Sequence, residues 1–358
     1  MISLSLTMIV KNEEDVLARC LNSVSGLFDE IIIVDTGSTD KTKEIARKFT
    51  SKIYDFEWCD DFSKARNFAL SKANSDFIMW LDADDVVSEE NLKNLINLKS
   101  KLTKNVDIIM LKYAISFIDN KPTFSFYRER IFNREKNLKF IDPIHEYIIL
   151  SGNILYENIT IEHRKVKFDN PKRNIKIYEK LLKQGVPFSP RQLYYYAREL
   201  YYNNKYTKAI TYLKKFLERK ETFLENKIEA CLIMSKCYQT KKQPENALKV
   251  LFSSFSYDYP RAEICCEIAY IFQEKKQFSL SNYWFKTASN ISPNMESGGF
   301  VLNDCYDYIP YLEMCVNFYY LKNYQQAFYY NNLAKQLRPS DEIVLNNEKA
   351  LINLLTKK

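Results

Sequence analysis

The first part of the chain alternates short, continuously apolar runs with amphipathic segments, and this alternation is what most constrains the fold. The apolar runs are Leu4–Val10, Glu30–Val34, Lys52–Phe56 and Phe77–Leu81. Helical spacing of apolar residues follows each run in turn, at Asp15–Val24, Lys41–Phe49, Ser63–Lys72 and Glu89–Lys101. Apolar strands separated by helices are typical of a parallel sheet with helices on both faces. We therefore predict an α/β domain at the N-terminus.

Two of these predicted strands lead directly into aspartates. Asp35 follows Glu30–Val34, and Asp82 follows Phe77–Leu81. In open α/β sheets, ligands bind in the crevice beyond the carboxyl ends of the strands. We therefore expect both aspartates at a ligand-binding edge of the sheet.

The segment that begins at Trp80 reads WLDADD and contains a D-x-D motif, Asp82 and Asp84. On an extended backbone these two carboxylates lie on the same side, where they suit a hard divalent cation such as Mn²⁺ or Mg²⁺. Such a cation normally completes its shell with substrate phosphates and water. Acidic loops at strand ends also occur without a metal, so the motif alone leaves both interpretations open.

From about Arg173 the strand pattern ends, and long segments rich in Tyr, Phe, Leu and Lys follow. Short turns at 204–206, 242–244, 276–278 and 322–324 separate pairs of helical segments. A small residue follows each turn at a fixed distance: Ala209, Ala247, Ser281 and Ala327. This pattern resembles the tetratricopeptide repeat, in which small residues lie where two antiparallel helices meet. The consensus Trp and Gly are missing, so a non-repeating helical bundle is the alternative.

The change of pattern predicts two domains, an α/β domain over residues 1–170 and an all-α repeat domain over 171–358 that binds an acceptor or a partner. Repeats of this kind form a concave surface suited to a polypeptide. Lys205, Lys208 and Lys215 are candidate contacts on its inner helices. The Tyr-rich stretches could also stack on single-stranded RNA, but at helical spacing they favour repeat packing.

Composition excludes several classes of protein. Six glycines and no G-x-G-x-x-G motif argue against a dinucleotide-binding fingerprint, and eight cysteines without a C-x-x-C pair, beside two histidines, argue against zinc fingers. The net charge of +7 is spread along the chain and does not predict a nucleic-acid partner. No signal peptide or transmembrane segment is apparent. We therefore expect a cytoplasmic protein with free thiols.

The N-terminal motifs together resemble those of family 2 glycosyltransferases. The matching segments are MIVKNEE at 8–14, IIVDTGSTD at 32–40, the ARN tripeptide at 65–67 and the D-x-D motif. The resemblance covers residues 1 to about 165. It implies a GT-A fold, a mostly parallel sheet with helices on both faces, that binds a nucleotide-sugar such as a UDP-sugar.

The resemblance also implies roles for individual residues. Asp35 would bind the nucleobase, Asp82 the ribose, and Arg66 the phosphate or base, while Arg130 would orient acceptor or sugar. The full set expected at the donor is Ile9, Val10, Asn12, Glu13, Asp35, Arg66, Asp82, Ala83 and Arg130. The metal would be held by Asp84, with Asp82 and His163 as further ligands.

The catalytic base implied by the resemblance is a carboxylate in the segment Asp142–Glu146, which reads DPIHE. Inverting transfer needs one carboxylate that deprotonates the acceptor on the face opposite the leaving diphosphate. Glu146 is the first candidate and Asp142 the second. Plain surface or core roles remain open for His163 and for His145.

The sequence thus predicts an inverting, metal-dependent glycosyltransferase that moves a hexose, GlcNAc or Glc, from a UDP-sugar to Ser, Thr or Cys of a protein or peptide. Bacterial enzymes with a similar arrangement modify bacteriocins or flagellin. One alternative is an enzyme acting on a cell-surface polysaccharide or lipid. The other is a repeat-based interaction protein whose first domain is inactive.

Overall fold

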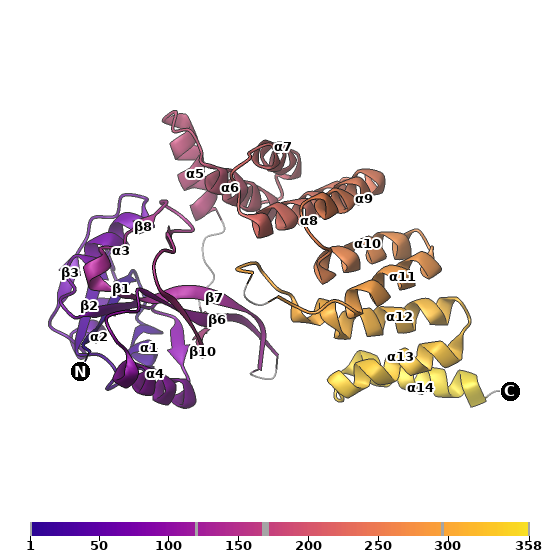
Figure 1. The fold of residues 1–358 in the computed structure, drawn as a ribbon, viewed down its shortest axis with the longest axis horizontal. Helices are drawn as coiled ribbons and strands as arrows, with labels where there is room; N and C mark the ends of the chain where they lie inside the picture. Colours follow the sequence, from indigo (N-terminus) through magenta and orange to yellow (C-terminus); the bar gives the residue numbers. More distant parts are fainter. Residues whose placement is uncertain (1, 119–120, 167–171, 295–296, 357–358) are drawn as a thin grey trace. The chain divides into compact units, whose positions relative to one another are not determined.

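The structure is a computed structural model that describes residues 2–118, 121–166, 172–294 and 297–356. The chain divides into two compact units, Met1–Val186 and Pro187–Lys358 (Figure 1). The pattern change in the sequence predicts a division at 170/171, and helix α5 (Arg173–Lys183) lies between that position and Val186. Each unit is described by itself below.

Unit 1 is built on an eight-stranded sheet with the order β3-β2-β1-β4-β7-β6-β10-β5. Its strands are Leu4–Val10 (β1), Glu30–Asp35 (β2), Ile53–Asp55 (β3), Phe77–Trp80 (β4), Asp85–Val87 (β5), Ile108–Ile118 (β6), Lys121–Asn133 (β7) and Ile154–His163 (β10). A separate two-stranded sheet joins Phe140–Ile141 (β8) and Tyr147–Ile148 (β9), and Arg134–Lys136 is a short 3₁₀ helix (η1).

The pairings divide the sheet into two regions. Strands β3, β2, β1 and β4 are parallel, and β10 pairs in parallel with β6. Strand β7 runs antiparallel to both β4 and β6, and β5 runs antiparallel to β10. The predicted α/β class with a mostly parallel sheet is therefore confirmed, and the antiparallel strands extend it.

Helices cover both faces of this sheet (Figure 1). These helices are Leu17–Ser23 (α1), Thr42–Ala46 (α2), Phe62–Leu70 (α3) and Glu89–Lys101 (α4). Helix α5 follows the last strand of the sheet in the chain. Alternate residues of β1, from Leu4 to Val10, enter one apolar core with α1, α2 and α4, whereas Ile32 and Val34 of β2 enter a second core with α3. This two-sided burial explains why the strands are apolar along their whole length.

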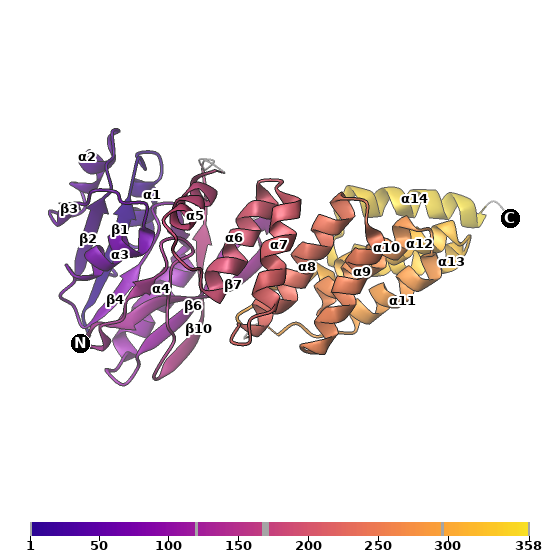
Figure 2. The ribbon, with the colours of Figure 1, turned by 90° about the horizontal axis from the view of Figure 1, so that it is seen from above.

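Unit 2 is entirely helical in the residues described. Its α-helices are Pro190–Tyr202 (α6), Tyr206–Leu217 (α7), Leu224–Thr240 (α8), Pro244–Ser253 (α9), Ala262–Glu274 (α10), Phe278–Ser289 (α11), Tyr308–Tyr320 (α12), Tyr324–Leu337 (α13) and Glu342–Thr356 (α14). Ser254–Ser256 (η2) and Asn303–Tyr306 (η3) are 3₁₀ turns. Figure 2 shows the helices from above.

The helices of unit 2 form four consecutive pairs, α6/α7, α8/α9, α10/α11 and α12/α13. The small residues that recur in the sequence, Ala209, Ala247, Ser281 and Ala327, are all fully buried. The turn inside each pair contains a residue with a positive φ near 58°: Asn204, Lys242, Lys276 and Lys322. The same turn geometry at four places supports the predicted tetratricopeptide-like repeat.

All eight cysteines are free, as predicted, and all but Cys59 are buried. Within the described residues no helix combines the length and the apolar composition needed to cross a bilayer.

Candidate active site

A cavity of about 590 Å³ lies in unit 1, where the carboxyl ends of β1, β2 and β4 meet. Ten of the residues predicted from the sequence line it, together with others such as Lys11, Thr36, Trp80, Arg128 and His145. The ten are Ile9, Val10, Asn12, Glu13, Arg66, Asp82, Ala83, Asp84, Glu146 and His163. Segments far apart in the sequence are therefore brought together at the edge where the strand pattern predicts a ligand.

The loops after β1 and β2 are tied to each other. The Oδ1 atom of Asn12, which has a φ of 56°, accepts a hydrogen bond from the backbone N of Thr39 at 2.8 Å. The backbone N of Asn12 donates to Oγ of Ser38 at 2.9 Å. Asn12 thus shapes one wall of the cavity through these contacts.

Asp35, at the end of β2, is almost completely buried, with 2% of its surface exposed. Its Oδ2 atom accepts from the backbone N–H groups of Gly37 and Ser38 at 3.0 and 2.9 Å. Its Oδ1 atom has no hydrogen-bond partner in the part of the chain described. A buried carboxylate oxygen that lacks a hydrogen-bond partner can accept a hydrogen bond from an N–H group of a ligand.

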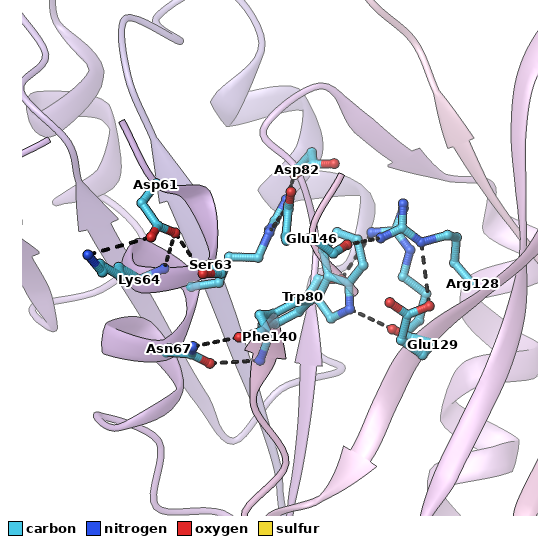
Figure 3. Close-up of polar contacts among 12 residues, drawn as sticks. Asp61, Ser63, Lys64, Asn67, Trp80, Asp82, Arg128, Glu129, Phe140 and Glu146 are labelled. Atoms are coloured by element: carbon cyan, nitrogen blue, oxygen red, sulfur yellow. Dashed lines mark hydrogen bonds and ion pairs between the residues drawn. The ribbon is translucent and has the colours of Figure 1, made fainter. Parts of the chain in front are cut away.

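Arg66 joins two of the predicted carboxylates. Its Nη2 atom donates to Oδ1 of Asp82 at 2.8 Å, and its Nε atom donates to Oε1 of Glu146 at 2.6 Å. The guanidinium also lies over the ring of Trp80, 4.3 Å from the ring centroid. Figure 3 draws the polar contacts around Asp82, Glu146 and Trp80.

The charges in this cluster stabilise one another. Burial alone would raise the pKa of Asp82, but the nearby guanidinium groups of Arg66 and Arg130 outweigh it and hold that pKa well below its usual range. Burial likewise opposes the charge on Arg66, but the carboxylates of Asp82 and Glu146 raise its pKa above the ordinary value. Asp82 and Arg66 are therefore ionised at neutral pH.

Asp84, Asp85 and His163 form a cluster whose potential ligand atoms all lie within 4.8 Å of one another. The Nδ1 atom of His163 is 3.3 Å from Oδ1 of Asp84 and 3.5 Å from Oδ1 of Asp85. The antiparallel pairing of β5 and β10 brings them together, because it places His163 directly opposite Asp85.

This donor set fits a divalent cation. Two carboxylates and an imidazole are ordinary ligands for one, and Oδ1 of Asp85 is buried without a hydrogen-bond partner among the described residues. Burial lowers the pKa of His163, but the close carboxylates of Asp84 and Asp85 outweigh this effect and raise it to about 10. The imidazole is thus protonated at neutral pH, and a cation that it ligates would replace that proton.

The clustered residues differ from the predicted ligand set in one member. Asp82 is paired with Arg66 instead, and Asp85, which the sequence analysis did not select, lies in the cluster. The sequence does contain one indication of this role, because Asp85 is the third aspartate of the WLDADD segment. Only the pairing of two distant strands shows that it faces His163.

Three of the predicted residues do not line the cavity. Asp35 is almost completely buried at the end of β2, next to the lining residue Thr36. Arg130 is fully buried and forms an ion pair with Asp85 at 3.0 Å, so its side chain offers no direct contact to a ligand. Asp142 lies in the turn before Glu146, with a φ of 74°. Arg128, which was not selected, does line the cavity, and its Nη2 atom is 3.4 Å from the backbone oxygen of Glu146.

Comparison with known proteins matches the N-terminal part of the chain to a glycosyltransferase family. The model of the family described as glycosyl transferase family 2 matches residues 5–158. The SPbeta prophage-derived glycosyltransferase SunS of Bacillus subtilis is 27% identical over 299 residues, covering 77% of this chain and 68% of that protein. A TPR repeat-containing protein of Synechococcus elongatus is 36% identical over 148 residues, covering 41% of this chain and 36% of that protein.

Among solved structures, residues 1–349 of S. aureus TarS in complex with UDP-GlcNAc are 17% identical, with 72% of this chain and 93% of that chain covered. The TM-score is 0.38, so this likeness is loose.

Proposed function

The chain is a glycosyltransferase with a family 2 domain at residues 5–158, and we propose that it moves a hexose from a UDP-sugar to a Ser, Thr or Cys side chain of a polypeptide. One observation carries the proposal: Arg66 joins Asp82 and Glu146 at the cavity that is also lined by Asp84 and His163 of the acidic cluster. Groups suited to a donor, to a cation and to a base therefore lie at one site.

Two aspartates at the carboxyl ends of β2 and β4 support the binding of a nucleotide-sugar donor. The unsatisfied Oδ1 atom of Asp35 is an acceptor suited to the N–H of a uracil ring. The Asp82 carboxylate, held by Arg66, is suited to accept from ribose hydroxyls. Asp84, Asp85 and His163 would hold a divalent cation, which stabilises the charge that develops on the leaving diphosphate.

The acceptor side is supported by Glu146. In the proposed reaction, the acceptor oxygen or sulfur attacks the anomeric carbon as the bond from that carbon to the diphosphate oxygen breaks. The proton of the acceptor passes to Glu146, and the nucleoside diphosphate leaves with the bonding electron pair. The hydrogen bond from Nε of Arg66 to Oε1 fixes the orientation of this carboxylate.

A polypeptide acceptor is supported by unit 2. Its first helices contact one another along the array, α6 with α8, α8 with α10 and α10 with α12, so they line the inner face. A repeated inner face of this kind is suited to an extended chain.

The test is a transfer assay with the full chain and Mn²⁺. A panel of nucleotide-sugars is screened for release of the free nucleotide, and the active donor is then offered to polypeptides, free monosaccharides and lipids, with mass spectrometry of the product. We expect turnover with a UDP-hexose and a product on a polypeptide side chain. Transfer to a monosaccharide or lipid without preference for a polypeptide would contradict the acceptor assignment. No turnover of any donor would contradict the whole proposal.

A further inference from the structure

Arg130 occupies an unusual position for a charged side chain. It is fully buried, and its guanidinium lies between two aromatic rings, 3.9 Å from the centroid of Trp80 and 4.3 Å from that of Tyr113. Its Nη1 atom donates to Oδ2 of Asp85 at 3.0 Å and to the backbone oxygen of Trp80 at 3.2 Å. Its Nε and Nη2 atoms have no hydrogen-bond partner in the described part of the chain.

Stability alone gives little reason for this arrangement. A buried ion pair loses hydration, and well-packed apolar residues of similar volume are often equally stable or more stable in its place. Buried polar groups that break the ordinary pattern occur preferentially at functional sites. Arg130 holds Asp85, and we therefore expect its role to lie in the orientation of that carboxylate.

Asp85 has two differently engaged oxygens. Oδ2 accepts from Nη1 of Arg130 and from the backbone N of Asp82, both at 3.0 Å. Oδ1 is 3.5 Å from Nδ1 of His163 and has no hydrogen-bond partner among the residues described. With Oδ2 held from two directions, the carboxylate cannot rotate freely, and Oδ1 stays directed at the cluster.

Two aromatic rings pack against the guanidinium of Arg130. The centroid of Trp80 lies 3.9 Å from it and that of Tyr113 lies 4.3 Å from it. The hydroxyl of Tyr113 is 2.8 Å from Nδ1 of His163, the nitrogen that also faces Asp84 and Asp85, so a cation bound at that nitrogen would replace this contact. The support of the cluster therefore comes from Arg130 through Asp85.

We propose that Arg130 is a positioning residue, which holds Asp85 in the orientation that binds the divalent cation. Arg130 itself touches neither the donor nor the acceptor. The inference rests on the cation site of the proposed function. Groups that orient ligands in this way are typically worth about 10–100-fold in metal affinity.

The test measures Mn²⁺ binding to the full chain in the presence of UDP, by electron paramagnetic resonance. Arg130→Gln retains a planar N–H donor but removes the charge. Arg130→Lys retains the charge but removes the planar guanidinium. Tyr156→Phe is the matched control, because Tyr156 is on β10 with His163 but is 42% exposed.

We expect the dissociation constant for Mn²⁺ to rise by about tenfold or more in Arg130→Lys and in Arg130→Gln, and to stay within about twofold in Tyr156→Phe. UDP affinity in EDTA should stay unchanged in all three, which a general loss of structure would not allow. Thermal melting identifies a variant that fails to fold, and the other Arg130 variant then decides.

Mn²⁺ affinities equal to wild type in both variants would overturn the positioning role and leave the proposed function intact. Absence of Mn²⁺ binding to the wild-type chain would overturn the role as well. Donor turnover in EDTA would then show separately whether sugar transfer proceeds without a cation.

Discussion

Nε of Arg66 donates to Oε1 of Glu146 at 2.6 Å, so the proposed catalytic base is held by the same guanidinium that binds Asp82. The two carboxylates come from distant segments, Asp82 from the end of β4 and Glu146 from the turn before β9. Arg66 therefore binds both the carboxylate proposed to contact the donor and the carboxylate proposed to deprotonate the acceptor.

Glu146→Gln should abolish transfer but spare donor binding. Glutamine has nearly the same shape and still accepts from Arg66, but it takes no proton from the acceptor. General-base catalysis contributes about 10²–10⁴-fold, so we expect turnover to fall in that range. Steady-state kinetics together with UDP-sugar binding measure both parts. More than about a tenth of wild-type turnover would exclude the role, except with a thiol acceptor, which is already partly ionised and depends less on a base.

Arg66→Lys should lower the turnover number and weaken donor binding. A lysine ammonium is a single point of charge that cannot span Asp82 and Glu146 with the fixed geometry of a guanidinium. We expect a loss of about tenfold or more in kcat/KM, with a folded protein. Arg47→Lys, on an exposed part of unit 1, is the control and should match wild type. Full activity of Arg66→Lys would show that coupling the two carboxylates does not matter.

Asp84→Asn should remove an anionic cation ligand with little change in shape. Transfer and donor hydrolysis should both fall by about two orders of magnitude or more, and EDTA should have a similar effect on the wild type. Asp55→Asn is a suitable control, because the side chain of Asp55 is 75% exposed and is paired with Lys43. Equal activity in EDTA and in Mn²⁺ would refute a role for the cation.

The parallel half of the sheet could be predicted from the sequence because its signals are local. The run at Leu4–Val10 forms β1 with the predicted bounds, and the aspartates that follow β2 and β4 lie at the expected edge. Apolar runs of strand length between helical segments need no long-range information to be recognised. Helix α2 is shorter than predicted, Thr42–Ala46, with Lys48 and Phe49 in a turn.

The rest of the site depends on long-range pairing. The registers of β6, β7, β10 and β5 join residues as far apart as Asp85 and His163, and no local pattern gives them. This is why Asp85 was not recognised as a neighbour of His163. It is also why Arg130 was assigned to a ligand: alternation along a strand tells which residues share a face but not that this face carries a buried ion pair.

Stability at low pH should depend on Glu30. Burial raises its pKa, but hydrogen bonds from Lys52, Ser5 and Asn74 outweigh burial and lower the pKa to about 2 from an ordinary 4.5. A carboxyl with a lowered pKa in the folded state stabilises the protein above pH 4.5, and this contribution is lost as the pH falls from 4.5 towards 2. Glu30→Gln should therefore cost about 2 kcal/mol at pH 7 and progressively less below pH 4.5.

Urea denaturation at pH 7 and at pH 3.5 measures this difference in the free energy of unfolding. Glu44→Gln is the control, since Glu44 is exposed in α2 and should change stability little at either pH. A cost for Glu30→Gln that is the same at both pH values would show that the ionised carboxylate does not provide the stability.

Acceptor binding should depend on the inner helices of unit 2 and not on the lysines that the sequence suggested. Lys208 and Lys215 lie on α7, the second helix of its pair, with their Nζ atoms 5.4 and 5.1 Å from the rings of Tyr196 and Tyr212. The inner helices α10 and α12 contain no Lys or Arg, and Glu274 and Glu313 line a cavity of about 530 Å³ between them.

Glu274→Lys should therefore raise the KM for a polypeptide acceptor, because it reverses an exposed charge on this inner face. Hydrolysis of the UDP-sugar should stay unchanged, since the donor binds in unit 1, and this split marks lost acceptor binding. Glu245→Lys is the matched control, because Glu245 is on the second helix α9 with its side chain 80% exposed. Both substitutions are at the surface and should each cost no more than about 0.5 kcal/mol of stability. An equal change of acceptor KM in the two variants would mean that overall charge, and not the inner face, determines acceptor binding.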